Sequence, residues 1–295
     1  MRSRSEVIKA VNDENISFAS LYLLRKDIMG LKLTRQLNSR HKTALEITDA
    51  IVLKNFSGSR FFSTENRETT YAVLKWILEN GSKDDGIDDK YDKVLDIASS
   101  HLVKRYGDKS ISNTLIEMIF ERHRNGRYKN DLIWILYETR DRSVLGKIAY
   151  YLLSREEKDV ELARRLLHFI PCIKEGESKL NTELYECSLN WLKDNASFLY
   201  YFGESFQQAF DAVPFKVSLE AKYLSIPVNS ENGKMLRKLD AEEQKRLEEL
   251  IQLNENLRMQ LADYSYSLYV QNRISWNKWM VYPMHERIRI AGGSQ

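Results

Sequence analysis

Two consecutive amphipathic stretches, 131–153 and 156–170, constrain the fold of this chain more than any other feature. Within each stretch, apolar residues recur every three or four positions, which places them on one face of a helix. Only a short polar turn separates the two stretches. A helix pair of this kind cannot bury its apolar faces alone, so it is typical of arrays in which similar pairs stack. The sequence therefore predicts an all-α fold.

Composition agrees with this prediction. The 295 residues include only 12 Gly and 4 Pro, whereas β-sandwiches and barrels need many turns built from these residues. Apolar residues make up 43% and charged residues 29% of the chain, which is typical of a folded chain rather than a disordered one. Because no segment approaches the roughly 20 apolar residues of a membrane span, we expect no contact with membranes.

Helical spacing recurs along most of the chain. We expect helices at 5–24, 44–53, 68–79, 91–106, 110–122, 130–138, 144–153, 160–170, 182–193 and 198–210. Ser110, Asp131 and Ser197 occupy positions where N-caps belong. Asp240 and Glu243 have the spacing of a capping box, which predicts a long helix to about residue 263, and an aromatic helix is expected at 264–280. The acidic run 82–90 is interpreted as a solvated connector.

One segment departs from the helical pattern. Apolar residues alternate from Phe215 to Tyr223, which favours a strand, and Pro227, Asn229 and Asn232 with Gly233 supply turn chemistry. We therefore expect strand only within about 212–238. The predicted organisation is a helical array at 1–210, an extended or β-hairpin excursion at 211–239 and a C-terminal helical cap at 240–295.

The helix pair formed by these two amphipathic stretches resembles a known repeat. Leu145–Leu153 followed by the run Lys158–Leu167 is similar to a HEAT repeat, in which an Asp-Val pair opens the second helix and Ala, Arg and Leu follow. Asp159 near the helix start offsets the helix dipole, while Val160, Ala163 and Leu167 are expected to point inward. The resemblance implies a HEAT-like α-solenoid of antiparallel helix pairs. Such arrays mostly serve as scaffolds or docking surfaces for proteins and sometimes for nucleic acids.

Basic residues concentrate in one turn and just after the next helix. They are Arg122, Arg124, Arg127, Lys129, Arg140 and Arg142. Turns of a stacked array line up along one edge, so these cations are candidates for binding phosphate groups. The alternative is structural, because a helix C-terminus favours Arg and His through its dipole. The first 60 residues are also basic, with 11 Lys and Arg against 6 Asp and Glu, although the whole chain carries only +3.

Two aromatic clusters, at 198–210 and 264–282, offer a second candidate site. In the second cluster, Tyr269, Arg273 and Trp276 share one face of the expected helix. An arginine beside aromatic rings is suitable for binding bases, sugars or the side chains of a partner. The alternative is that the rings form core. We expect Trp276 to be partly exposed and Trp279 to be the more buried of the two, because a charged residue such as Arg273 is rarely buried unpaired.

The residues that usually carry catalysis or metals are scattered. The five histidines show no zinc-site spacing, and phosphate-binding glycine loops are missing, so we expect neither metal nor cofactor. Cys172 and Cys187 are interpreted as two separate buried thiols in a reduced, cytoplasmic protein. A nucleophile–base arrangement of these cysteines with His168 is a remaining possibility.

The sequence thus favours a non-enzymatic scaffold that presents a concave surface to another protein. One alternative is a nucleic-acid-binding protein, which depends on the basic turn. A second alternative is an enzyme similar to the HEAT-like DNA glycosylases, in which a carboxylate beside aromatic side chains serves base excision. Asp131 with Trp134, or Asp194 with Trp191, are the pairs that such a resemblance suggests.

Overall fold

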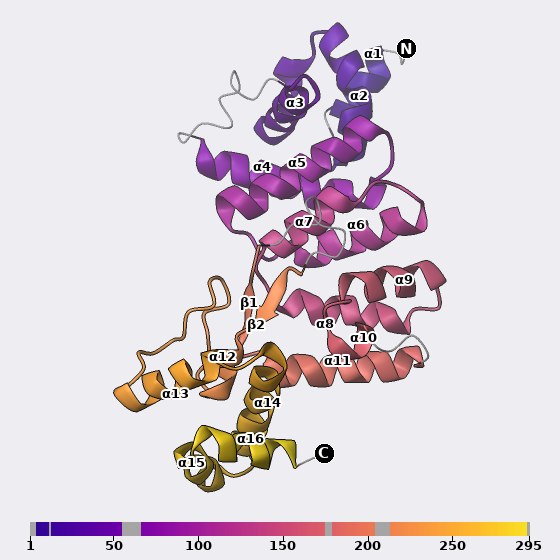
Figure 1. Ribbon diagram of the computed structural model, residues 1–295. Coiled ribbons are helices and arrows are strands. Elements are labelled where there is room, and N and C mark those ends of the chain that lie inside the picture. Colours follow the sequence, from indigo (N-terminus) through magenta and orange to yellow (C-terminus); the bar gives the residue numbers. More distant parts are fainter. Residues whose placement is uncertain (1–3, 12, 55–65, 175–178, 204–212, 294–295) are drawn as a thin grey trace. The chain divides into compact units, whose positions relative to one another are not determined.

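The computed structural model describes residues 4–11, 13–54, 66–174, 179–203 and 213–293. They form two compact units, unit 1 up to Thr139 and unit 2 from Arg140 onward (Figure 1). The described residues contain sixteen α-helices and one two-stranded sheet, which confirms the all-α prediction. The division between the units falls inside the array predicted for 1–210.

Unit 1 is built from helices that pack on their neighbours in the chain. Its α-helices are α1 Arg4–Val11, α2 Phe18–Gly30, α3 Ser39–Val52, α4 Arg67–Gly81, α5 Asp89–Tyr106, α6 Ser112–Arg124 and α7 Asn130–Glu138. Helix α4 packs against α5, α6 packs against α7, and α5 also contacts α3 and α7. The consecutive helices α5 and α6, expected at 91–106 and 110–122, are therefore not paired chiefly with each other, because each packs more closely on another helix.

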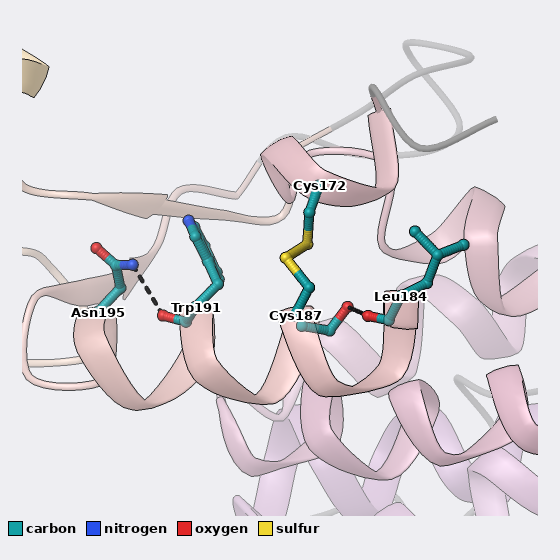
Figure 2. The surroundings of a disulfide bond; sticks show 6 residues. Cys172, Leu184, Cys187, Trp191 and Asn195 are labelled. Carbon is teal, nitrogen blue, oxygen red and sulfur yellow. Dashed lines mark hydrogen bonds between the residues drawn. A yellow bond between two sulfur atoms is a disulfide. The ribbon is translucent and has the colours of Figure 1, made fainter. Parts of the chain in front are cut away.

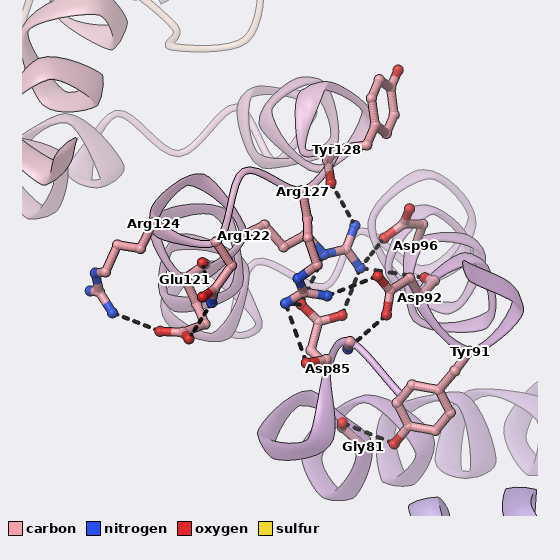
Figure 3. Close-up of polar contacts among 12 residues, drawn as sticks. Gly81, Asp85, Tyr91, Asp92, Asp96, Glu121, Arg122, Arg124, Arg127 and Tyr128 are labelled. Atoms are coloured by element: carbon pink, nitrogen blue, oxygen red, sulfur yellow. Dashed lines mark hydrogen bonds and ion pairs between the residues drawn. The ribbon is translucent and has the colours of Figure 1, made fainter. Parts of the chain in front are cut away.

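The core of unit 1 depends on a close approach at Gly81. The Tyr91 hydroxyl donates a hydrogen bond to the Gly81 carbonyl oxygen at 3.0 Å (Figure 3), and the ring of Phe18 stacks on that of Tyr91 with centroids 5.5 Å apart. A Cβ atom at position 81 would lie 2.9 Å from both side chains. Glycine therefore lets α4 pack closely against α2 and α5.

Unit 2 contains the remaining helices and the sheet. Its elements are α8 Ser143–Tyr150, a 3-10 turn Tyr151–Leu153, α9 Glu157–Leu166, α10 Pro171–Lys174, α11 Asn181–Asn195, β1 Leu199–Tyr201, β2 Phe215–Val217, α12 Leu219–Tyr223, α13 Ala241–Ile251, α14 Glu255–Gln271, α15 Arg273–Val281 and α16 Met284–Gly292. Helix α8 packs against α9 and α11. Helix α14 packs against α12, α15 and α16.

The sheet corrects two sequence-based predictions. Strand β1 lies where a helix was expected at 198–210, and it pairs antiparallel with β2 in the register Leu199 with Val217 and Tyr201 with Phe215. Strand is therefore not confined to 212–238. The alternation from Phe215 continues as strand only to Val217, because Ser218 caps α12 by accepting a hydrogen bond from the Ala221 amide. Phe206 and Phe210, from the first aromatic cluster, lie outside the described residues.

Capping residues explain where other helices differ from expectation. The capping box at Asp240 is confirmed, but α13 ends at Ile251 rather than near 263. The side chains of Asn254 and Asn272 cap α14 and α15, so the aromatic helix expected at 264–280 is broken. An Asn side chain accepts hydrogen bonds from the free amides of a first turn, which lets a new helix begin there. Ser110 and Asp131 are not N-caps, since α6 begins at Ser112 and α7 at Asn130.

Helix α9 partly follows the pattern on which the repeat resemblance rests. Ala163 and Leu167 are buried as expected, while Val160 is half-buried. Asp159 is also buried in the first turn, where its carboxylate accepts a hydrogen bond from the Ser154 hydroxyl at 2.8 Å. The segment before α9 is thereby fixed to the start of the helix.

Candidate functional site

The basic turn of unit 1 is the centre of an internal ion-pair network. The Arg122 side chain is only 1% exposed, and its guanidinium donates to both carboxylate oxygens of Asp85 at 2.9 Å (Figure 3). The same guanidinium lies 2.9 Å from a carboxylate oxygen of Asp96. Burial opposes the charged form of Arg122, but Asp85 and Asp96 outweigh it and raise the pKa of the guanidinium. Burial raises the pKa of Asp96 to about 6, although Arg122 acts in the opposite direction.

Arg127 extends the network to the loop before α5. Its guanidinium pairs with Asp85 at 2.9 Å and with Asp92 at 2.8 Å. Gly86 has a φ of +104° and a Cβ there would lie 2.8 Å from the Arg127 guanidinium, so the loop requires glycine. Despite its burial, the pKa of Asp85 is lowered by hydrogen bonds from Arg122 and by the charges of both arginines.

These contacts remove Arg122 from the candidate phosphate-binding residues, because a buried guanidinium with two carboxylate partners has no surface to offer. Arg127 is engaged in the same way, and Arg124 pairs with Glu121 at 2.7 Å at the surface. Lys129 is half-buried just before α7. The acidic run 82–90 is likewise more than a solvated connector, since Asp85 anchors the turn. In the sequence, the only hint of this network is that the acidic run 82–90 and the basic turn 122–129 carry complementary charges.

The two arginines expected to extend the basic patch lie in unit 2. The guanidinium of Arg140 lies over the ring of Tyr201 in β1, 5.3 Å from its centroid. Arg142 donates a hydrogen bond to the carbonyl oxygen of Ala196, just after α11. Both side chains therefore hold the region of unit 2 where α11 leads into β1.

The C-terminal aromatic residues are brought together as expected. The rings of Tyr269 and Trp276 meet edge to face with centroids 5.1 Å apart, and the Arg273 guanidinium lies 5.1 Å from the Tyr269 centroid. Trp276 is half-buried and its indole N–H donates to the Ser265 hydroxyl at 2.8 Å. Trp279 is only 2% exposed, so the predicted order of burial is confirmed. That Tyr269, Arg273 and Trp276 form a binding site stays a prediction.

Unit 2 also contains a groove that the sequence did not reveal. It has a volume of about 1400 Å³ and is bounded by α10, the end of α11, β2, α12 and α14. Its aromatic lining comes from four rings, those of Phe169, Trp191, Phe215 and Tyr266. We call this hollow the unit 2 groove. Its size exceeds the roughly 300–1000 Å³ of small-molecule pockets, so it is suited to a larger ligand.

A buried lysine ties three of the bordering helices together. The Lys222 ammonium donates to the side-chain oxygen of Asn195 at 2.6 Å and pairs with Asp263 at 2.5 Å. The Asn195 amide in turn donates to the Trp191 carbonyl oxygen at 2.8 Å, which fixes its orientation (Figure 2). Because a buried ammonium needs partners, these bonds hold α11, α12 and α14 in place around the groove.

The remaining charges are unevenly distributed around the groove. Lys174, Lys193 and Lys216 come from α10, α11 and β2, where Asp194 is the one acidic lining residue among those that the structure describes. Glu255 and Asp263 come from α14. The described lining is therefore rich in lysine on α10, α11 and β2, whereas α14 contributes two carboxylates, of which Asp263 is paired with Lys222.

Cys172 and Cys187 lie beside this groove and are not separate thiols. They form a disulfide that joins α10 to α11 with their Cα atoms 6.5 Å apart (Figure 2). The prediction of two unpaired cysteines is wrong in the structure, because the turn after α9 returns α10 onto α11. A cysteine nucleophile beside His168 is excluded while the disulfide is intact.

Removing the disulfide is expected to weaken unit 2. Replacing Cys172 and Cys187 with serine should lower the free energy of unfolding by about 3 kcal/mol, because the bond closes a loop between residues 15 apart in sequence. Denaturant unfolding in oxidising buffer measures this loss. Under a dithiol reductant the wild type should fall to the value of the variant. Equal stability of the wild type and the serine variant in oxidising buffer would show that the disulfide is not formed.

The two carboxylate–tryptophan pairs have different surroundings. Asp131 accepts a hydrogen bond from the Tyr128 hydroxyl at 2.9 Å, while the ring of Trp134 lies under the Lys104 ammonium, 3.7 Å from it. Trp191 and Asp194 both line the unit 2 groove. The structure thus places the second pair in the unit 2 groove.

The described residues form neither a candidate metal cluster nor a membrane-spanning helix. No group of three or more His, Cys, Asp or Glu side chains is arranged to hold a metal ion there. None of the helices described is both long enough and apolar enough to cross a membrane.

No protein-family model, curated protein or solved structure matches the chain.

Proposed function

We propose that this chain is a non-enzymatic helical-repeat scaffold that binds a partner protein through the unit 2 groove. The observation that carries the proposal is the lining of the groove, which combines aromatic rings with charges of both signs. Protein interfaces favour aromatic anchors surrounded by polar groups, whereas a surface for nucleic acid carries a strong excess of positive charge. The proposed location is the cytoplasm.

The repeat architecture is part of the proposal and has support in both units. In unit 1, α2 contacts α3, α4 contacts α5 and α6 contacts α7, while α2 contacts α4 and α3 contacts α5. Contacts between alternate helices are typical of stacked pairs. In unit 2, α8 and α9 pack together and α11 packs on α8.

The test uses two groove side chains that are already exposed. Met259 and Val270 on α14 are 46% and 64% exposed, so replacing each with glutamate should leave the fold intact and abolish capture of partner proteins from the native cell. Leu236→Glu is the matched control, because Leu236 is 66% exposed but does not line the groove. Partners that are retained by the groove variants, or lost equally with the control, would contradict the proposal.

The same experiment separates the alternative functions. Capture that disappears after nuclease treatment and weakens steeply with salt would identify nucleic acid as the ligand, because phosphate contacts release counterions. The glycosylase alternative instead requires that the wild type releases bases from damaged DNA and that Asp194→Asn abolishes this release. We expect the wild type to release no base.

A further inference from the structure

The sequence of α14 does not match its exposure in the structure. Its apolar residues form two stripes on opposite sides of the helix, one of Leu257, Leu261 and Leu268 and one of Met259, Tyr266 and Val270. Asn256, Gln260, Ser267 and Gln271 form a polar face between them. Leu261 and Ala262 are buried against the rest of unit 2, yet Met259 and Val270 are left exposed at the unit 2 groove. The exposed side of α14 therefore has the composition of a covered surface.

The groove-lining residues of α14 have helical spacing. Met259, Asp263, Tyr266 and Val270 follow one another at intervals of four, three and four and all line the groove. The rise of about 1.5 Å per residue makes the 17-residue helix roughly 25 Å long. An extended strand would find no unpaired backbone along a helix, whereas a second helix can pack its side chains between those of the first.

The charges around the groove specify the flanks of such a helix. The lining carries Glu255 and Asp263 on α14, and Lys174, Lys193 and Lys216 on α10, α11 and β2; Asp263 is also paired with Lys222. A helix lying between these two groups of charges meets carboxylates along one flank and ammonium groups along the other. Like charges placed together would weaken binding, so each flank of the bound helix must carry the charge opposite to that of the groove side it faces.

We propose that the unit 2 groove binds an amphipathic helix of the partner protein, with an apolar stripe on α14, a basic flank toward Glu255 and Asp263 and an acidic flank toward the lysines. This inference rests on the proposed function and adds the kind of segment that binds. Helix-in-groove binding of this type uses apolar anchors spaced three and four residues apart.

A designed peptide tests the inference with the purified full-length chain. The probe is a helix of about 15 residues with leucines spaced three and four apart, lysines along one flank and glutamates along the other. We expect it to bind with a Kd of about 10 μM in a fluorescence anisotropy titration. A scrambled peptide of the same composition and a peptide with a central proline should bind at least tenfold more weakly, since neither presents a continuous apolar stripe.

Variants of the protein show whether the peptide occupies this groove. Val270→Glu should weaken binding at least tenfold, whereas the matched Leu236→Glu should not change it. A peptide with lysines on both flanks should bind more weakly than the mixed peptide. The double variant Lys174→Glu and Lys193→Glu should reverse that preference, because both sides of the groove then carry carboxylates. Both lysines are exposed, so the fold is not at risk.

The possible outcomes separate this inference from the proposed function. If Val270→Glu abolishes capture of partner proteins but no helical peptide binds, the groove binds protein in another form and the inference is wrong. Binding that survives Val270→Glu, or is equal for the scrambled peptide, also overturns it. Loss of capture together with peptide binding that follows the charge switch supports both.

Discussion

Replacing Arg122 with methionine is expected to lower the free energy of unfolding by about 3–5 kcal/mol. The substitution keeps most of the side-chain volume but removes the counter-ion of Asp96 and leaves Asp85 with Arg127 alone. Uncompensated buried charges, rather than lost packing, cause the expected loss. Urea unfolding at neutral pH followed by circular dichroism measures it.

Arg124→Met is the matched control for this experiment. Arg124 lies two residues away in the same helix, but its pair with Glu121 is at the surface, where such pairs contribute about 0–1 kcal/mol. A loss at Arg122 no larger than that at Arg124 would mean that the network does not hold the turn. The basic turn would then be available for phosphate after all.

Trp279→Ala should be about as damaging, with an expected loss of about 3–5 kcal/mol. The ring is enclosed by the core of the C-terminal helices, where it packs against Tyr223 and Tyr264. Truncation removes this contact and leaves a cavity. Chemical denaturation measures the difference from the wild type.

Trp276→Ala provides the comparison at the neighbouring tryptophan. It should cost clearly less, about 1–2 kcal/mol, since this ring is half-buried and loses one hydrogen bond to Ser265. Equal losses at the two positions would show that Trp276 is core. The cluster of Tyr269, Arg273 and Trp276 would then have no role as a docking surface.

The helical architecture could be predicted from the sequence because it depends on local patterns. Apolar spacing located α7 at Asn130–Glu138 without error, and the capping box at Asp240 located the start of α13. The errors arose where a single polar residue decides the outcome. Asn272 interrupts an apolar run that would otherwise form one helix, and its effect depends on a side-chain hydrogen bond to the Ser275 amide.

The sites were harder to predict because they combine distant segments. Asp85 and Arg122 are separated by 37 residues, and charge alone does not show that the two will be buried together. Lys222 is an ordinary lysine in sequence, but in the structure Asn195 and Asp263 hold it beside the groove. A sequence signal for the groove is present in α14, where Met259, Tyr266 and Val270 form a second apolar stripe.

The central claim is that the unit 2 groove binds a partner protein, and site-specific photo-crosslinking tests it most directly. A benzoylphenylalanine placed at position 270 in the native cell should crosslink to protein, and the same residue at position 236 should not. Crosslinks to nucleic acid, or equal protein crosslinks from both positions, would contradict the account.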